Sequence, residues 1–393
     1  MSLPSGYKRL EYIQSTGTQY VDAGFKPTGS TKVVCDFQML NQGSSQQGVF
    51  GSRPGTSGRF TVFTGNGIAD LQVDYNTEQT LASVGSSITG LNVNSRTTLE
   101  VSNSLVINGT TVKTVSAASF ASAYNLFLFA NNNAGKAQLP GILKLYSCQI
   151  YDNGTLVRDF IPCKNTGGAV GLWDDVNSVF YGNAGTGTFE AGPIVVPLSE
   201  ITELEYIQSN GTQYINTNII PTTAHSIVFD FKFDSYINDT WGFSSFVDGN
   251  TRWSCGLFNN SFYLTGVTAS QSSNLLTRTT FSGSCGFNLT YPLLLFAQNY
   301  LGSAYGYCSG RLYSCQIYDN GTLVRDFIPA KLADGTVGLY DKLNGLLYVN
   351  AGTGTFEAGP VVASPSIFVN IDGIWKPINH IYVNINNIWQ KST

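Results

Sequence analysis

Apolar and polar residues alternate along much of the chain, and a period of two residues predicts β-strands. The segments that carry this signal are rich in β-branched and aromatic residues and are punctuated by glycine or asparagine: 31–39, 125–130, 143–152, 226–233 and 292–297. The 3.6-residue period of an amphipathic helix is nearly absent. The pattern therefore predicts an all-β fold.

Short turns connect several of these strands. Asn-Gly pairs tolerate the positive φ values of a type I′ turn, and they occur at Asn108-Gly109, Asn153-Gly154 and Asn320-Gly321. Each pair predicts a hairpin of two antiparallel strands. Many short strands at regular intervals, in a unit of about 180 residues, predict a two-sheet sandwich or jelly roll.

The chain is a tandem duplication. LYSCQIYDNGTLVRDFIP occurs at 145–162 and again at 312–329, while LEYIQSTGTQY at 10–20 returns as LEYIQSNGTQY at 204–214. The offsets are 312 − 145 = 167 and 204 − 10 = 194, a difference of 27 residues. The two copies therefore differ mainly in their middle portions.

Proline-containing segments, which cannot continue a hydrogen-bonded ladder, mark the boundaries. They predict one jelly-roll domain at 1–193, a second at 194–361, and a small module at 362–393. In that module IFVNIDGIWK is followed by IYVNINNIWQ, which predicts two β-hairpins. So small a unit is of limited stability alone, and we expect it to pack on the second domain or to pair with other chains in a homo-oligomer.

The composition argues against several partners. Charged residues make up 12% of the chain, with 21 basic against 25 acidic, so no basic field is available to neutralise nucleic-acid phosphates. No apolar run reaches the length that crosses a bilayer, and we expect no membrane insertion. The N-terminal sequence MSLPSGYKRLEYIQS lacks the apolar core of a signal peptide, so we expect synthesis in the cytoplasm without a signal peptide.

Cysteine and aspartate are the residues to consider for bridges and metals. Seven cysteines without a CxxC pair or nearby histidines are read as buried thiols rather than a disulfide or zinc framework. No cofactor is expected. Calcium is the one possible metal, through Asp152 and Asp319 in the turns or through Asp174 and Asp175.

The repeated anchors also carry a family resemblance. Together with VGLWDDVNSVFYGNAGTGTFEAGP and VGLYDKLNGLLYVNAGTGTFEAGP, they resemble concanavalin A-like, laminin-G-like jelly-roll modules of phage, prophage and gut-bacterial surface proteins. The terminal hairpins are similar to short repeats of phage tail and fibre proteins. The resemblance implies two tandem sandwiches used for adhesion or carbohydrate binding, usually without catalysis.

Glutamates and histidines are the residues to consider for a catalytic site. Retaining glycosidases need two carboxylates about 5 Å apart, and Glu200, Glu203 and Glu205 come closest to such an arrangement. The histidines, His225 and His380, have no evident catalytic partner. We therefore expect that the chain is not an enzyme, with a polysaccharide hydrolase as an alternative.

Sugar recognition needs aromatic faces together with amide and hydroxyl groups, and loops on a rigid sandwich usually supply them. The divergent middle of each copy is therefore the expected binding region. Its candidate residues are Trp241, Arg252, Trp253, Tyr263, Tyr300 and Tyr305 in the second copy, and Arg59, Asn66 and Tyr75 in the first. Trp241 and Trp253, flanked by polar residues, are expected to be exposed. The alternative for each aromatic residue is a place in the core.

The function expected from these observations is that of a phage or prophage virion surface protein, such as a tail fibre, a baseplate or a capsid-surface component. Its jelly rolls would bind glycans of the bacterial surface. The alternative is an architectural or decoration protein whose partners are other virion proteins.

Overall fold

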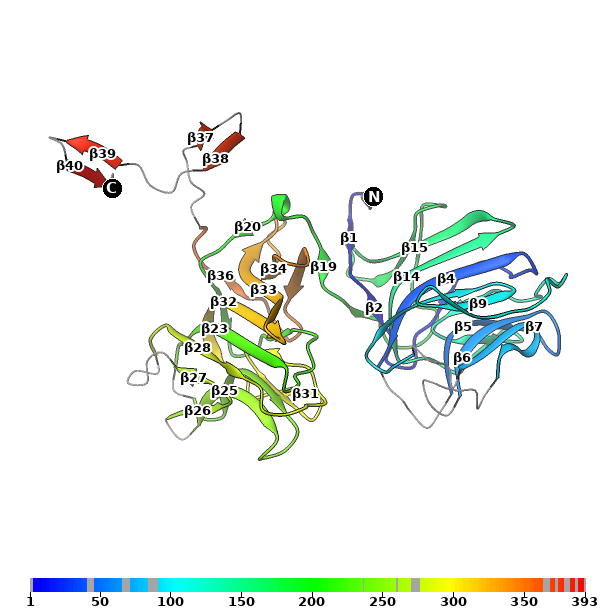
Figure 1. Cartoon of the computed structure of the whole chain (residues 1–393), viewed down its shortest axis with the longest axis horizontal. Coiled ribbons are helices and arrows are strands. Elements are labelled where there is room, and N and C mark those ends of the chain that lie inside the picture. Colours follow the sequence, from blue (N-terminus) through cyan, green and yellow to red (C-terminus); the bar gives the residue numbers. More distant parts are fainter. Residues whose placement is uncertain are drawn as a thin grey trace. The chain divides into compact units, whose positions relative to one another are not determined.

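The protein is an all-β molecule of two compact units, Met1–Val196 and Pro197–Thr393, each described here by itself (Figure 1). The computed structural model describes residues 3–40, 46–65, 71–83, 91–235, 237–258, 261–269 and 276–362, and the backbone of four strands between 368 and 391. Two sheets whose strands are mostly antiparallel face each other in each unit, so the expected all-β sandwich fold is confirmed. The part so described contains no helix long and apolar enough to span a bilayer.

The first unit is a sandwich of a larger and a smaller sheet. The larger sheet has the order β10-β9-β8-β4-β14-β15-β16-β17; in addition, β1 pairs with β15, β2 pairs with β14, and β18 pairs with β2. Its strands are β1 (Tyr7–Arg9), β2 (Ile13–Gln14), β4 (Thr31–Met39), β8 (Arg96–Val101), β9 (Ser104–Ile107), β10 (Thr110–Thr114), β14 (Leu143–Asp152), β15 (Thr155–Asn165), β16 (Val170–Asp174), β17 (Val179–Tyr181) and β18 (Glu190–Ala191). The smaller sheet consists of β3 (Val21–Asp22), β5 (Gln47–Arg53), β6 (Arg59–Thr64), β7 (Leu71–Ala82), β11 (Phe127–Leu128), β12 (Asn131–Asn133) and β13 (Lys136–Gln138). The short strand β19 (Ile194–Val195) ends the unit.

The second unit repeats this architecture after a single helical turn, η1 (Leu198–Glu200). One sheet includes the order β35-β34-β33-β32-β23-β28-β27; in addition, β20 pairs with β33, β21 pairs with β32, and β36 pairs with β21. Its strands are β20 (Thr202–Glu203), β21 (Ile207–Asn210), β23 (His225–Phe233), β27 (Thr268–Ala269), β28 (Thr279–Ser284), β32 (Ser309–Asp319), β33 (Thr322–Lys331), β34 (Val337–Asp341), β35 (Leu346–Val349) and β36 (Glu357–Ala358). The other sheet consists of β22 (Ile215–Asn216), β24 (Thr240–Phe246), β25 (Arg252–Phe258), β26 (Ser261–Thr265), β29 (Leu294–Leu295), β30 (Gln298–Tyr300) and β31 (Ser303–Tyr305).

The duplication is visible strand by strand. The repeated sequence LYSCQIYD forms the central strands β14 and β32, and TLVRDFIP forms their partners β15 and β33. The first unit additionally carries the hairpin β9–β10. This hairpin accounts for part of the extra length in the middle of the first copy.

The Asn-Gly turns lie where the sequence predicts them. The two residues of each turn have positive φ, for example 49° and 77° at Asn108 and Gly109, and 48° and 79° at Asn153 and Gly154. The strand residues that flank them, such as Asp152 and Thr155, are paired. The predicted hairpins are therefore confirmed.

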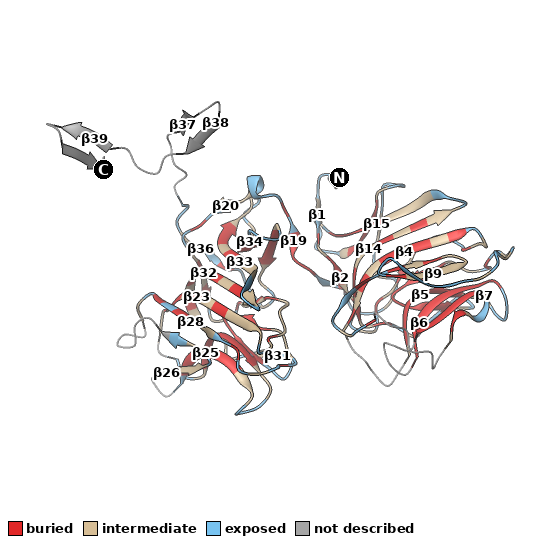
Figure 2. Ribbon diagram, in the orientation of Figure 1, coloured by how far each residue is buried: buried red, intermediate tan, exposed pale blue. Residues whose placement is uncertain are grey.

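Strand alternation builds the cores of the sandwiches, as the banding in Figure 2 shows. In β23, Phe229, Phe231 and Phe233 are buried while the residues between them are partly exposed. Phe229 stacks on Phe231 at 4.9 Å and meets Phe243 of the opposite sheet edge-on at 5.2 Å. Interlocked rings of this kind fill the space between the sheets at high density.

The adjacent Arg158 and Asp159, repeated as Arg325 and Asp326, have a structural role. Arg158 lies 3.4 Å from the buried carboxylate of Asp174, and Asp159 accepts a hydrogen bond from Gln149 on the paired strand. Arg325 and Asp341 repeat the ion pair in the second unit at 3.6 Å. Each Arg and Asp therefore meets its own partner on a neighbouring strand.

The terminal residues form two hairpins, β37 (Phe368–Ile371) with β38 (Ile374–Pro377) and β39 (Tyr382–Ile385) with β40 (Ile388–Lys391). The predicted pair of hairpins is therefore present. Whether 362–393 is a separate module, and whether it joins copies of the chain, stays a prediction.

All seven cysteines are buried, and none is in a disulfide. Cys35 and Cys148 face each other across β4 and β14 with their sulfur atoms 3.0 Å apart. Burial raises the pKa of six of the thiols, to about 12 in the case of Cys163; the others are Cys35, Cys255, Cys285, Cys308 and Cys315. The interpretation of the cysteines as buried free thiols is confirmed.

Burial predicts that the thiols of the folded protein are unreactive. A free cysteine has a pKa of about 8.5, and only the thiolate reacts, so a raised pKa and a closed core both slow modification. We expect Ellman's reagent at pH 8 to label the native protein hardly at all within minutes and to label seven thiols after denaturation. Rapid labelling of the native protein would contradict this packing.

Candidate functional site

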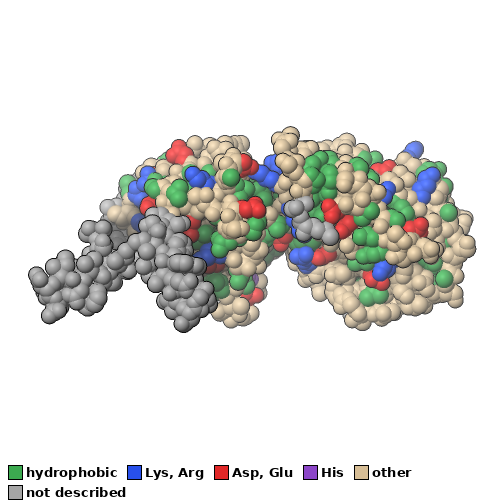
Figure 3. Space-filling model, turned by 90° about the horizontal axis from the view of Figure 1, so that it is seen from above, with side chains coloured by type: hydrophobic (Ala, Val, Ile, Leu, Met, Phe, Trp, Pro, Cys, Tyr) green, Lys and Arg blue, Asp and Glu red, His purple; other side chains and the backbone are tan. Residues whose placement is uncertain are grey.

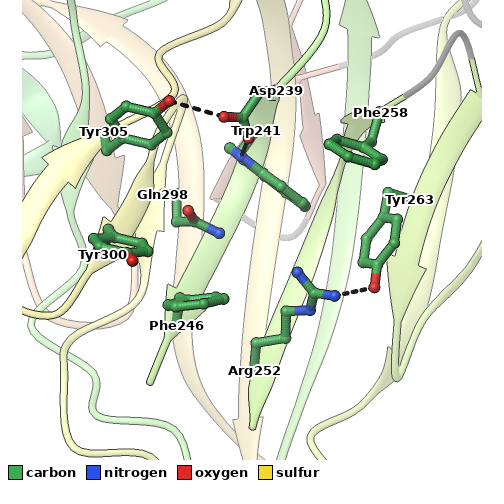
Figure 4. A pocket seen from close by; sticks show the side chains of 9 residues that line it. All are labelled: Asp239, Trp241, Phe246, Arg252, Phe258, Tyr263, Gln298, Tyr300 and Tyr305. Atoms are coloured by element: carbon green, nitrogen blue, oxygen red, sulfur yellow. Dashed lines mark hydrogen bonds between the residues drawn. The ribbon is translucent and has the colours of Figure 1, made fainter. Parts of the chain in front are cut away.

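A cavity of about 510 Å³ opens on one sheet of the second unit (Figure 4). It lies on the face of β24, β25, β26, β30 and β31 that points away from the sandwich core. Trp253, Cys255 and Leu257 of β25 point into the core, so the alternate residues of that strand belong to the opposite face. We call this outer surface the cavity face. Its lining residues are Asp239, Trp241, Phe246, Arg252, Phe258, Tyr263, Gln298, Tyr300 and Tyr305.

The strand register arranges the lining residues in rows across the sheet. One row runs through Trp241, Gly256 and Tyr263, and a parallel row runs through Tyr300, Phe246 and Arg252. Between them lies a row of small polar residues that includes Ser244 and Gln298. The cavity face therefore alternates aromatic and polar bands.

Glycines make room for the indole of Trp241. A Cβ atom at Gly256 would lie 2.5 Å from Cε3 of Trp241, and one at Gly306 would lie 2.6 Å from its Cδ1. The indole therefore lies against backbone at both positions. Its ring meets that of Tyr263 edge-on at 5.7 Å, and only 3% of Trp241 remains exposed.

Asp239 closes one end of the cavity with a fixed carboxylate. The indole N–H of Trp241 donates to its Oδ1 at 3.0 Å, and the hydroxyl of Tyr305 donates to its Oδ2 at 2.9 Å. The hydrogen bond to this carboxylate raises the pKa of Tyr305. The phenol therefore stays protonated and holds the carboxylate in place.

Arg252 lies at the other end of the cavity in Figure 4. Its guanidinium donates a hydrogen bond to the hydroxyl of Tyr263 and lies 4.2 Å from the centre of the same ring. Phe246 lies on another side, 5.8 Å away. No carboxylate among the described residues lies within 4.0 Å of this guanidinium. In the corresponding sheet of the first unit, by contrast, Arg59 forms ion pairs with Asp74 and Glu78.

Exposed aromatic rings line the opening of the cavity. Phe258, Tyr300 and Tyr305 are 42%, 45% and 52% exposed. Tyr300 stacks on Phe246 at 4.9 Å and has Tyr305 at 6.0 Å. Gln298 is buried and donates to the hydroxyl of Ser244 at 3.3 Å. Flat apolar rings therefore surround amide, hydroxyl, carboxylate and guanidinium groups.

The first unit has a matching face, defined by the same register on β5, β6, β7 and β12. Arg59 takes the place of Arg252, and Asn131 that of Gln298. In the row that holds Trp241 and Gly256, the first unit has Gly48 opposite Phe63. Arg59, Phe63 and Asn131 are all buried, so the matching face does not present the exposed rings of the second unit.

The structure brings together five of the predicted residues: Trp241, Arg252, Tyr263, Tyr300 and Tyr305. Whether they bind a ligand stays a prediction. The expected exposure of Trp241 and Trp253 is wrong. Trp253 is fully buried, since it occupies the core side of β25, where its ring meets Phe243 edge-on. A tryptophan flanked by polar residues on a strand can point inward because its neighbours point outward.

The candidates of the first copy do not form a comparable surface. Tyr75 is buried and donates to the carbonyl of Gly29 at 2.7 Å. Arg59 is 9% exposed and is paired with Asp74 and Glu78. Neither is free to meet a ligand, because each is covered and already has partners. Asn66 lies outside the described residues.

Sequence reasoning missed four lining residues: Asp239, Phe246, Phe258 and Gln298. It also placed the site on loops, whereas most of the cavity is built from strands. A usable signal was present for Phe258, because it lies an even number of residues from Arg252 along β25 and therefore on the same face. Two-residue steps from Trp241 along β24 do not reach Phe246, because the strand register shifts between Trp241 and Phe243.

The aspartates considered for calcium and the residues considered for catalysis are the remaining candidates. Asp174 is buried in its ion pair with Arg158, and Asp152 accepts a hydrogen bond from Thr28 at 2.9 Å. Within the part of the chain that the structure describes, no three His, Cys, Asp or Glu side chains are grouped so that they could hold a metal ion. Glu200 in η1, Glu203 in β20 and Glu205 just beyond that strand are exposed. His225 contacts Thr222, whereas His380 lies outside the described residues.

The surface of each unit agrees with the composition. In Figure 3 the visible faces are mostly neutral polar side chains and backbone, with scattered charged and apolar groups. No extended basic area is visible on the described residues in this view.

The packing of the Trp241 indole against glycine predicts how a substitution changes the unfolding free energy. Gly256→Ala places a Cβ in contact with the indole and with the carbonyl of Thr240, and such overpacking costs about 1–3 kcal/mol. Gly249→Ala, in the loop before β25, meets nothing within 4 Å and serves as the matched control. Chemical denaturation should show a lower unfolding free energy for the first variant alone. Equal unfolding free energies for the two variants would contradict this packing of the indole.

Comparison with known proteins gives little guidance. No family model matches the chain, and no curated protein matches it. Among solved structures, the chain aligns with a K499G mutant of NanB sialidase from Streptococcus pneumoniae at 10% identity and a TM-score of 0.23, covering 90% of this chain and 63% of that chain. NanB with Optactamide aligns at 9% identity and a TM-score of 0.23, covering 86% and 74%.

These matches bear on two predictions. The matched proteins are enzymes, so the prediction that the chain is not an enzyme is contradicted and is not carried further. At this identity and TM-score the likeness gives this chain neither an active site nor a substrate. None of the comparisons finds the resemblance to phage or laminin-G-like modules, which stays a prediction from the sequence.

Proposed function

We infer that the second unit binds glycans and that a sugar residue enters the cavity on its outer face. The observation that carries this proposal is the combination of exposed aromatic rings with polar groups in one concave site. Tyr300, Tyr305 and Phe258 offer flat apolar faces to the C–H surfaces of a sugar. Asp239, Arg252 and Gln298 offer hydrogen-bonding groups for its hydroxyls.

The dimensions and rigidity of the site support the same proposal. Ligand cavities typically measure about 300–1,000 Å³, and 510 Å³ accommodates one or two sugar rings. Most lining residues come from paired strands, and Trp241, Tyr305 and Asp239 hold one another by hydrogen bonds. A pre-formed site loses little conformational entropy when a ligand binds.

The biological setting is part of the proposal and rests on the sequence resemblance alone. The glycans would belong to a bacterial surface, and the chain would stand on the surface of a phage or prophage particle as a tail-fibre, baseplate or capsid component. Partners among other virion proteins, and pairing of copies through the terminal hairpins, would complete it.

A glycan array tests the proposal with the full chain and three variants. Tyr300→Ala and Tyr305→Ala should each weaken binding roughly tenfold, because each removes an aromatic face from the mouth. Leu343→Ala, at a residue that is 52% exposed and does not line the cavity, is the control and should bind as the parent does. A blank array, or binding that both tyrosine variants retain, would contradict the proposal. A blank array together with capture of a virion protein would favour the architectural alternative.

A further inference from the structure

We propose that Arg252 binds the carboxylate of an acidic sugar residue, which makes the cavity selective for carboxylate-bearing glycans. This inference rests on the glycan-binding function proposed above and specifies its substrate class. The juxtaposition that supports it is a guanidinium without a carboxylate partner at one end of an aromatic cavity.

The duplication supplies an internal comparison. Arg59 and Arg252 occupy the same register position in the two units. Two residues after Arg59, Thr61 pairs with Asp74 on the next strand; two residues after Arg252, Ser254 pairs with Thr265. In the first unit the guanidinium lies 3.7 Å from Asp74 and 3.1 Å from Glu78. In the second unit Thr265 stands in place of Asp74. The internal carboxylate has been replaced by a neutral side chain while the arginine is retained.

The two guanidinium groups consequently differ in what surrounds them. Arg59 is 9% exposed, and its charge is neutralised within the unit. Arg252 is held in position by the ring and hydroxyl of Tyr263 but keeps N–H groups that no described residue accepts. Asp74 and Glu78 therefore occupy, in the first unit, the position that a ligand carboxylate would take in the second.

The chemistry of the cavity favours a carboxylate over a more highly charged anion. A guanidinium presents paired N–H donors that match the two oxygens of a carboxylate. The fixed carboxylate of Asp239 lies at the other end, and its oxygens are engaged by Trp241 and Tyr305. One positive and one negative group in the same cavity suit a ligand of single negative charge, whose remaining hydroxyls can donate to Asp239.

The first test compares acidic glycans with their neutral counterparts. An array of uronic-acid oligosaccharides is printed beside the same compounds with their carboxyl groups reduced to alcohols, and binding of the full chain is then measured by titration calorimetry. A charge-assisted hydrogen bond corresponds to roughly a tenfold to hundredfold change in affinity. We expect the acidic form to bind more tightly by this factor. Equal affinity for the two forms would overturn the proposal while leaving glycan binding itself intact.

Three variants assign the selectivity to Arg252. Arg252→Gln should abolish the difference between acidic and reduced glycans. Thr265→Asp should do the same by supplying the internal carboxylate of the first unit, whereas Thr265→Asn, which has nearly the same shape without the charge, should retain the preference. Selectivity that survives Arg252→Gln, or that is lost equally in both Thr265 variants, would contradict the assignment. Stronger binding of sulfated than of carboxylated glycans would also contradict it.

Discussion

A β-strand presents its side chains alternately to the two faces of its sheet, and this constraint determines both the core and the cavity of the second unit. Along β25, Trp253, Cys255 and Leu257 fill the sandwich, so Arg252 and Phe258 must point outward. The hydrophobic effect fixes the register, since a slip of one residue would expose the core side chains. The cavity is therefore as rigid as the core that holds its strands.

The duplication shows how one scaffold carries two different faces. Trp241 opposite Gly256 in the second unit corresponds to Gly48 opposite Phe63 in the first. The first unit has the ring of Phe63 on β6 in this row, whereas the second has Trp241 on β24 and Tyr263 on β26. This exchange changes the outline of the surface. The segments LYSCQIYD and TLVRDFIP, which lie in the other sheet of each unit, are the same in both copies.

The sequence was sufficient for the fold because the signals that set it are local. Alternation predicted the strands, and Asn-Gly pairs such as Asn153-Gly154 predicted the turns. The cavity was predictable only in part, because it depends on which side of a sheet a residue faces. Arg252 and Trp253 are neighbours in the chain, yet one lines the cavity and the other lies in the core. Polar flanking residues could not distinguish them, nor could they reveal Gln298, which comes from a distant strand.

The most direct test of the central claim is a crystal structure of the full chain with the oligosaccharide that it binds most tightly. The account predicts difference density for a sugar ring on the outer face of the β24–β26 sheet, in contact with Tyr300 and Tyr305. A sugar bound elsewhere on either unit, with this cavity empty, would contradict it.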